Sequence, residues 1–424
     1  MPMFKKLRWL LISPFLLAFD STAIYDNRFI PLFDPPRLSL DGTDSVFGAY
    51  PMAATASVAF SDRDEGKEVG IPEIYGTLDL IKLDNALGIK GCADEMVRLD
   101  PSLRGGGGVP WHINGKLQFQ GISFWYHQGI TDYLSAGATW YFLRANAHDN
   151  YQRIDTNLIL GTGDREELER KRRAIMDALG LCPGQWGDAG FGDIDAYFRL
   201  GKRWDYRARF RRIDVGLRVG MLAPTGVIRA ENRVPSVPFG GNGFWGVYTA
   251  LDLLLEPKED LKVCLLARVS KRLPRETCRR FPVDCEPQIF GATMAQVKID
   301  PGLTSIVAPC VILENLRGGF GLALQYTLVY HLRDSWKCVS ITDCAFKEAL
   351  TPEKIKENTC NVEKATKWGA DYITLDAFYD FGRMKIFREF DPVVSLRWDI
   401  PRSMIVASRS AKTNRLSLGV EVAF

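Results

Sequence analysis

The stretch that decides the fold is Arg212-Ile-Asp-Val-Gly-Leu-Arg-Val-Gly-Met221, near the middle of the chain. Every second side chain is apolar, and those between are arginine, aspartate or glycine. Because successive side chains of a β-strand point to opposite faces, this stretch predicts a strand with one apolar and one polar face. Residues 193–200 alternate in the same way, so the two stretches predict an antiparallel hairpin with its charged residues on one side.

The same alternation recurs through most of the chain. It predicts thirteen candidate strands, at residues 52–61, 115–128, 132–145, 190–202, 211–224, 244–257, 260–272, 291–300, 303–315, 318–333, 369–382, 384–400 and 413–424. Single-chain bacterial barrels have even strand numbers, so residues 72–85 and 402–409 are candidates for one more strand. We expect a total of about 12 to 14 strands.

Alternating strands fit both a soluble β-sandwich and a membrane-spanning barrel. The candidate strands run to about 10 to 14 residues, which suits a tilted crossing of the hydrocarbon core and exceeds the usual length in soluble proteins. Aromatic side chains gather near strand ends, as expected at a membrane interface: Trp140, Phe142, Phe244, Trp245, Tyr330, Tyr379, Phe381 and Trp398. We therefore predict an all-β fold, a transmembrane antiparallel up-and-down β-barrel with short loop helices.

The first residues have the features of an export signal. Lys5, Lys6 and Arg8 precede an apolar run at residues 9–19, and small residues follow up to Ala23. This order predicts a signal peptide at residues 1–23, cleaved after Ala23. After it, the longest uncharged stretch, residues 234–251, is interrupted by proline and glycine, so we expect no hydrophobic helix that spans a bilayer.

Three segments follow from these patterns: the signal peptide, residues 24–112 and residues 113–424. The last holds the main part of the barrel. Residues 24–112 supply the first strand or strands and either a plug inside the barrel or a periplasmic tail, and residues 74–87 within them are a possible helix. Residues 164–179 and 350–368 predict loop helices, and loops of that length belong on the extracellular side of a barrel.

Composition limits the partners and cofactors. The net charge of +3 falls close to neutral without the signal peptide, so no nucleic-acid partner is expected. The cysteines show no CxxC spacing and the four histidines form no cluster, so neither a metal site nor another cofactor is expected. An oxidising compartment would permit disulfides, for which Cys278 with Cys285 and a pair among Cys338, Cys344 and Cys360 are the nearest candidates.

The final residues, Arg415-Leu-Ser-Leu-Gly-Val-Glu-Val-Ala-Phe424, alternate to the last position. They resemble the C-terminal assembly signal of bacterial outer-membrane proteins, in which a polar residue, a glycine and a terminal aromatic stand at fixed spacing. Ser417, Gly419 and Phe424 match it, whereas Val422 stands where that family usually has an aromatic residue. The resemblance implies a place in the bacterial outer membrane, contact with its lipid, and insertion by the outer-membrane assembly machinery.

Within that class, the chain resembles porins and the long-chain fatty-acid transporters. The segment Gly220-Met-Leu-Ala-Pro-Thr-Gly226, a strand that runs into proline and glycine at a rim, is similar to segments of the transporter group. The resemblance implies a channel or transporter for small or hydrophobic solutes.

A barrel of 12 to 14 strands has a narrow lumen that is largely filled by side chains. The polar faces of the predicted strands supply charges of both signs to it: Asp193, Asp195, Arg199, Arg212, Asp214, Arg218, Lys262, Arg268, Asp376, Asp380 and Arg397. Rings of one sign select ions, so a mixed lining favours internal salt bridges over a selectivity filter.

Two alternatives to a channel are an outer-membrane enzyme, such as a lipase or protease on a barrel scaffold, and a surface adhesin or structural barrel. An enzyme needs a nucleophile beside a base. His331 is a candidate base, but the chain has no Gly-x-Ser-x-Gly motif and no serine that alternation places beside His331. We therefore expect no enzyme activity.

Overall fold

The computed structural model describes residues 27–30, 45–62, 67–91, 94, 96–100, 108–154, 162–207, 209–382 and 391–423. The predicted signal peptide, Cys92 and Phe424 lie outside the described residues.

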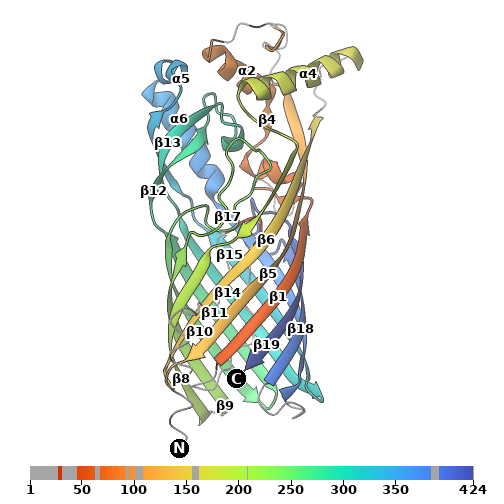
Figure 1. Cartoon of the computed structure of the whole chain (residues 1–424), viewed down its shortest axis with the longest axis vertical. Coiled ribbons are helices and arrows are strands. Elements are labelled where there is room, and N and C mark those ends of the chain that lie inside the picture. Colours follow the sequence, from red (N-terminus) through yellow and green to blue (C-terminus); the bar gives the residue numbers. More distant parts are fainter. Residues whose placement is uncertain are drawn as a thin grey trace, which may run out of the picture.

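Among these residues, twelve antiparallel strands close into a barrel, and their order around the ring follows the sequence (Figure 1). The ring closes where β1 pairs with β19, from Val46 opposite Ala423 to Thr55 opposite Asn414. The predicted all-β barrel is confirmed, with the smallest strand number of the expected range. The strands are β1 (Ser45–Ala56), β5 (Pro110–Gly129), β6 (Leu134–Arg153), β8 (Ile194–Arg207), β9 (Phe210–Ala223), β10 (Gly246–Lys258), β11 (Leu261–Arg272), β14 (Leu303–Arg317), β15 (Phe320–His331), β17 (Trp368–Asp380), β18 (Asp391–Arg402) and β19 (Asn414–Ala423).

The two ends of the barrel differ in their connections. At one end, here the turn end, β5–β6, β8–β9, β10–β11 and β14–β15 are joined by two to four residues. The opposite end, the loop end, carries the helices (Figure 1). These are η1 (Ile71–Tyr75), α2 (Leu80–Ile89), α4 (Thr162–Ala178), η2 (Gln288–Phe290), α5 (Cys344–Ala349) and α6 (Pro352–Thr366). No helix within the described ranges is both long and apolar enough to cross a membrane.

A three-stranded sheet of β12 (Arg275–Phe281), β13 (Thr293–Asp300) and β16 (Ser335–Ile341) stands at the loop end (Figure 1). After short breaks, β12 continues β11 and β16 continues β15. In the same way, β13 leads into β14 across Pro301-Gly302. Placing residues 291–300 in the barrel was therefore wrong. Alternation cannot distinguish β13 from a barrel strand, because β13 also has one buried face.

Three other strand predictions need correction. Residues 72–85 lie mainly in η1 and α2, and only Leu78–Asp79 form a short strand, because Pro72 favours the first helical turn and the Asp79 carboxylate accepts the Ile81 N–H at the start of α2. Residues 402–409 contribute only an isolated bridge at Ser408 beyond the end of β18. β1 begins seven residues before the predicted 52–61, since its small side chains blur the alternation.

Four shorter strands complete the described structure: β2 (Ala59–Phe60), β3 (Glu68–Val69), β4 (Leu78–Asp79) and β7 (Gln185–Phe191). β7 and β8 are two parts of one path along β6. β7 pairs with the loop-end part of β6 and β8 with its turn-end part. The path is interrupted at Gly192 and Asp193, and the Asp193 side chain binds a loop inside the barrel.

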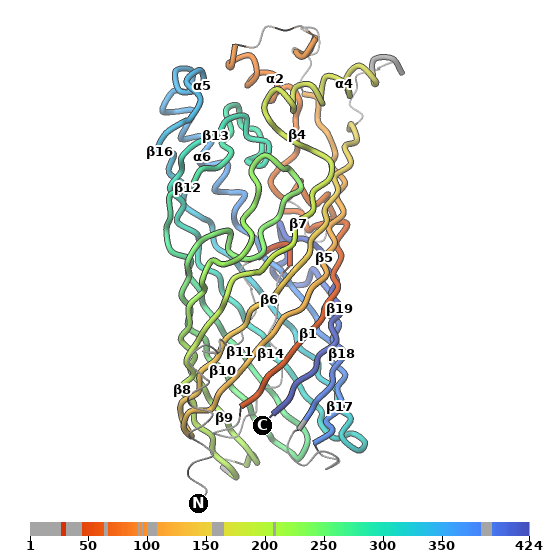
Figure 2. Tube along the Cα trace, in the orientation of Figure 1, coloured from red at the N-terminus to blue at the C-terminus, as the bar shows by residue number. Residues whose placement is uncertain are grey.

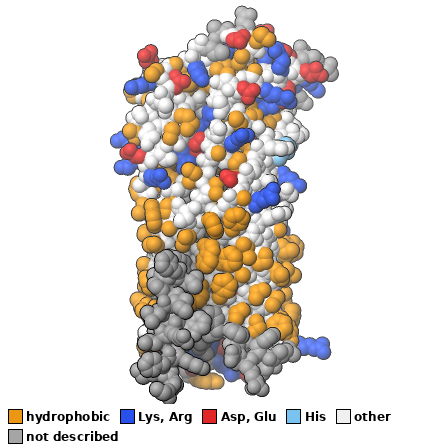
Figure 3. Space-filling model, in the orientation of Figure 1, with side chains coloured by type: hydrophobic (Ala, Val, Ile, Leu, Met, Phe, Trp, Pro, Cys, Tyr) orange, Lys and Arg blue, Asp and Glu red, His pale blue; other side chains and the backbone are white. Residues whose placement is uncertain are grey.

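Exposed apolar side chains of many strands form a belt on the turn-end half of the barrel, here the apolar belt, and Figure 3 shows part of it. On β9 it consists of Leu217, Val219 and Met221, whose side chains are 46%, 59% and 46% exposed. The outward apolar positions of β9 span residues 213–221, close to the roughly 9 to 11 residues of a tilted transmembrane strand. So large an apolar surface is unfavourable in water and indicates contact with lipid.

The loop-end half of the barrel is filled by chain. Residues 224–245, here the inner loop, connect β9 to β10 and pass between the walls (Figure 2). Val237 and Phe239 of this loop are buried in a cluster with Phe119 of β5 and Ile306 of β14, which lie six strands apart around the ring. Phe29 and Ile30 belong to the same cluster, whereas α2 packs in a separate one with α4. A plug formed by residues 24–112 as a unit stays a prediction.

Candidate functional site in the barrel interior

The turn-end half of the interior contains a network of buried ion pairs. Asp252 of β10 contacts Arg199 of β8 at 2.6 Å and Arg218 of β9 at 2.9 Å, and Arg199 also reaches Asp214 at 2.8 Å. Further along, Arg268 of β11 binds Asp195 of β8 at 3.1 Å, across two intervening strands. Two of these contacts, Arg199 with Asp252 and Arg268 with Asp195, join strands that are not neighbours in the sheet, so they stabilise the curvature of this wall.

A second network lies on the wall formed by β17, β18 and β19. Arg397 pairs with Asp376 at 3.3 Å, and Arg415 pairs with Asp399 at 2.7 Å. The Asp399 carboxylate also accepts the Thr374 hydroxyl at 2.6 Å. Since each positive charge here has a negative partner, this wall offers little free charge to a passing ion.

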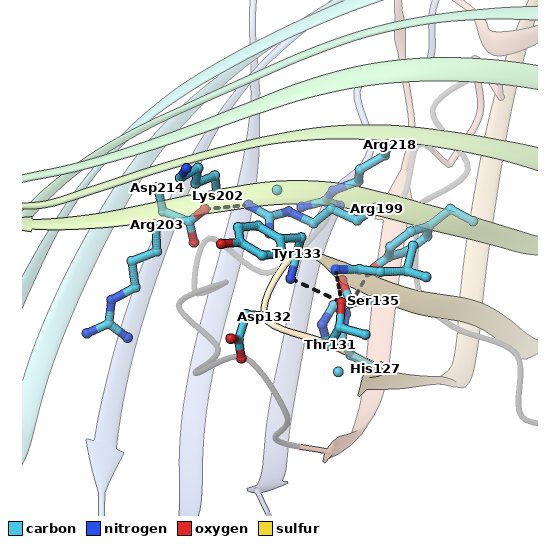
Figure 4. Close-up of a pocket in the computed structure, with 14 residues that line it drawn as sticks. His127, Thr131, Asp132, Tyr133, Ser135, Arg199, Lys202, Arg203, Asp214 and Arg218 are labelled. Carbon is cyan, nitrogen blue, oxygen red and sulfur yellow. Dashed lines mark hydrogen bonds and ion pairs between the residues drawn. The ribbon is translucent and has the colours of Figure 1, made fainter.

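A small recess opens beside the first network, at the turn end. It has a volume of about 60 Å³ and is lined by His127, Tyr133, Arg199, Arg203, Asp214 and Arg218, among others. Figure 4 shows Arg199 reaching to Asp214 beside Tyr133, with Arg203 pointing away from them. Since a cavity that holds benzene measures about 150 Å³, this recess is too small for an organic solute.

Asp193 anchors the inner loop to the barrel wall. Its carboxylate accepts the N–H groups of Gly226 at 3.1 Å and Gly241 at 2.8 Å, and it pairs with Arg272 at 2.9 Å. Gly240 has a φ of +143°, and a Cβ there would lie 2.5 Å from the Asp193 carboxyl carbon. The glycine at this position is therefore required for the loop to approach its anchor.

Two further contacts hold the inner loop across the lumen. Tyr141 of β6 donates its hydroxyl to the Phe239 carbonyl at 2.7 Å, and the Asn27 amide donates to the Pro238 carbonyl at 2.9 Å. The loop is thus tied to the wall at Asp193 and Tyr141 and to the N-terminal segment at Asn27. In this conformation it narrows the passage between the two ends.

Towards the loop end, above the inner loop, lies a larger cavity of about 180 Å³, here the loop-end cavity. Its lining combines aromatic rings with arginines, and includes Phe29, Tyr75, Phe244, Trp336, Arg28 and Arg229. Two guanidiniums lie close to the ring of Tyr75, with the Cζ of Arg28 4.1 Å and that of Arg229 5.1 Å from its centroid. Burial alone would raise the pKa of Tyr75, but these two cations hold it below its ordinary value.

His331 lies at the edge of this cavity in a complete hydrogen-bond network. Its Nε2 lies 2.9 Å from the Asp334 carboxylate, and its Nδ1 lies 2.8 Å from the Thr304 hydroxyl. A carboxylate, an imidazole and a hydroxyl in this order resemble the parts of a hydrolytic triad. Thr304 is only 2% exposed and does not line the cavity, however, so a substrate carbonyl cannot reach it. The absence of enzyme activity stays a prediction.

No family model matches the chain, and no curated protein sequence matches it. The chain is similar to an outer membrane channel from Pseudomonas putida F1, at 12% identity and a TM-score of 0.49, over 92% of this chain and 99% of that one. A FadL homologue from Pseudomonas aeruginosa gives 8% identity and a TM-score of 0.33, over 91% and 90% of the two chains. The deltaS2S3 mutant of the TodX monoaromatic hydrocarbon channel gives 8% identity and a TM-score of 0.35, over 91% of each chain.

The structure brings most of the predicted lumen residues into ion pairs. Arg199, Asp214 and Arg218 meet in one network, and Asp195 with Arg268 and Asp376 with Arg397 form pairs of their own. Lys262 pairs with Glu314 at 2.6 Å, and Asp193 holds the inner loop. Arg212 and Asp380 are only half-buried: Arg212 lies 3.9 Å from Asp205, and Asp380 accepts the Gly382 N–H at the β17–β18 turn.

Sequence reasoning did not single out Asp252, Arg272, Asp399, Arg28, Arg229 or Tyr75. Asp252 and Arg272 lie on predicted strands, so alternation on those strands could have placed them inside. The last three lie outside the barrel strands, where no periodicity applies.

The residues of the predicted assembly signal within the described range face the interior. Ser417 is buried, and a Cβ on Gly419 would lie 2.3 Å from the ring of Tyr50 in the neighbouring β1. Gly419 is therefore needed for packing in the finished barrel, whatever its role in assembly.

The predicted disulfides do not form. None of the eight described cysteines is joined in a disulfide. Cys278 belongs to β12, whereas Cys285 lies in the turn before η2 and is held against α6, where its N–H donates to the Asn358 side chain. Cys338, Cys344 and Cys360 lie on β16, α5 and α6. No group of three or more metal-binding side chains occurs in the part of the chain that the structure describes.

Proposed function

We propose that this chain is an outer-membrane channel or transporter for small or hydrophobic solutes. The observation that carries the proposal is a closed barrel with a lipid-facing belt outside, ion-paired walls inside and an inner loop across its passage. A filled barrel with a tethered internal loop suits a gated passage better than an open pore. The loop end, with its long connections, is the extracellular side, and the turn end is the periplasmic side.

Conductance in planar bilayers tests this proposal, together with uptake of arabinose and of a short fatty acid into liposomes. Asp193→Asn weakens the anchor of the inner loop, so we expect several-fold higher conductance than in the parent chain. Asp188→Asn, which changes an exposed carboxylate on β7, is the matched control and should leave conductance unchanged. Zero conductance and zero uptake in both the parent chain and the Asp193 variant would exclude a channel.

The proposal includes export and assembly. Residues 1–23 act as the signal peptide, so the protein recovered from outer membranes should begin at Ile24, as terminal sequencing would show. Phe424 is the residue that the assembly machinery recognises. Its deletion should lower the amount of folded barrel in the membrane, while Phe424→Tyr, which keeps a terminal aromatic, should not.

A further inference from the structure

Two arginines of the loop-end cavity have no acidic partner among the described residues. Arg28 donates from Nη1 to the Ala365 carbonyl at 3.1 Å, and Arg229 donates from Nη2 to the Val234 carbonyl at 3.3 Å. Neither guanidinium forms an ion pair with any described residue. Arg229 is only 7% exposed, and its Nε has no hydrogen-bond partner in the described structure. A buried cation left in this state is costly, and an anion at the site would offset that cost.

Most of the other charges around the cavity have a partner. Arg279 pairs with Glu231 at 2.6 Å, Arg272 pairs with Asp193, and the Asp334 carboxylate lies 2.9 Å from the Nε2 of His331. Asp149, in the adjoining recess next to Arg229, lies beyond ion-pair distance of that arginine. The unpaired positive charge of the described cavity lining therefore lies at Arg28 and Arg229, both close to the ring of Tyr75.

The rest of the cavity wall suits an aromatic ring. Phe244, Trp336 and Trp368 line it together with Tyr75, and the indole N–H of Trp336 is buried without a partner in the described residues. The volume of about 180 Å³ exceeds the roughly 150 Å³ that accommodates benzene, which leaves room for one small polar group on the ring.

We propose that the loop-end cavity binds a small aromatic carboxylate, with its carboxylate on Arg28 and Arg229 and its ring against Tyr75 and Trp336. Guanidiniums bind carboxylates through paired, charge-assisted hydrogen bonds, and the aromatic walls contribute ring packing. This inference rests on the proposed channel function, for which it names a class of solute. It requires both the charge and the ring, so a neutral aromatic or a simple anion should bind more weakly.

The test uses the folded mature chain in detergent, titrated with benzoate and followed by calorimetry and by the fluorescence of Trp336 and Trp368. Benzyl alcohol supplies the ring without the charge, and acetate supplies the charge without the ring. We expect saturable benzoate binding, with affinity at least about tenfold above that of either comparison ligand. Equal affinity for benzoate and benzyl alcohol, or no saturable binding of benzoate, would overturn the proposal.

Variants locate the site. Arg229→Gln should weaken benzoate binding about tenfold or more, and Arg28→Gln, at a half-buried position, keeps the test decisive if the first variant fails to fold. Arg233→Gln, an exposed arginine of the same inner loop outside the cavity, is the matched control and should bind as the parent chain does. Unchanged binding in both cavity variants would also overturn the proposal.

The two proposals can fail separately. A chain that conducts in bilayers but does not bind benzoate contradicts the cavity proposal alone. A chain that binds benzoate but passes neither ions nor solutes contradicts the channel function and leaves a binding site.

Discussion

The two halves of β6 place opposite chemistry on the same faces. From the turn end as far as Phe142, which is exposed, the outer face carries only apolar side chains, while Ser135 and Thr139 are buried on the inner face. From Arg144 onward, Arg144, Asn146 and His148 point outward, and Leu143, Ala145 and Ala147 are buried inside. Alternation continues without interruption across this change. The wall therefore extends beyond the apolar belt, with lipid against one half and water against the other.

In each half of the barrel, the polarity of the interior is opposite to that of the outer face. The turn-end half has an apolar outer face, and its interior is built from ion pairs such as Arg218 with Asp252. The loop-end half follows the rule for soluble proteins, with a polar exterior and an apolar cluster that includes Phe119 and Phe239. Polar contacts thus stabilise one half where hydrophobic packing stabilises the other, and substitutions should expose the difference.

The largest expected effect comes from removing a shared carboxylate in the turn-end half. Asp252→Ala would leave Arg199 and Arg218 without their common partner, and Arg218 is only 1% exposed. Loss of one member of a buried ion pair costs about 3–5 kcal/mol. Urea unfolding in detergent would measure the free energy of unfolding. Asp205→Ala, which removes an exposed partner of Arg203, is the control and should cost less than about 1 kcal/mol. Equal losses in the two variants would show that the interior pairs do not stabilise this half.

The outer faces of the two halves should differ in their tolerance of charge. Leu418, near the middle of β19, is 50% exposed on the belt, and Leu418→Arg should cost about 2–4 kcal/mol in a lipid bilayer. Asn146→Arg adds the same side chain to the outer face above the belt and should change stability by less than about 0.5 kcal/mol. Unfolding in phospholipid vesicles measures both. Similar costs at the two positions would place the membrane boundary elsewhere.

Sequence periodicity predicted the barrel because lipid and lumen impose a period of two on every spanning strand. The stretch at residues 212–221 forms β9 with the predicted faces, and Arg218 and Asp214 are buried on the inner one. The same rule could not separate β13 from the barrel strands, since a strand of a soluble sheet also buries one face. Periodicity also did not indicate that the outer face of β6 changes from apolar to polar, because the period stays two when the polarity of the faces reverses.

The loop-end interior was beyond sequence reasoning for a different reason. Asn27 meets Pro238 across 211 residues of chain, and Tyr75 meets Arg28 and Arg229 from three separate segments. Such contacts depend on the finished ring and leave no local pattern. The glycines and prolines at residues 234–251 did indicate irregular chain, and Gly240 shows what one of them does: it makes space for the Asp193 carboxylate.

The smallest expected effect concerns a carboxylate in the apolar loop-end half. Asp149 of β6 is buried with one oxygen lacking a hydrogen-bond partner in the described residues. Burial raises its pKa to about 7, and the nearby Arg229 offsets only part of that rise. Because the folded state holds this proton more tightly than the unfolded state does, stability should fall as the pH rises from about 4 to 7 and change little above.

Between pH 8 and pH 5 the folded protein should gain roughly 2–3 kcal/mol from this group. Asp149→Asn, which cannot titrate, should flatten that part of the pH profile measured by urea unfolding. Asp132→Asn, at an exposed carboxylate in the β5–β6 turn, should leave the profile unchanged. If the Asp149 variant keeps the full pH dependence, the carboxylate is hydrated, and the loop-end interior is more polar than its apolar cluster implies.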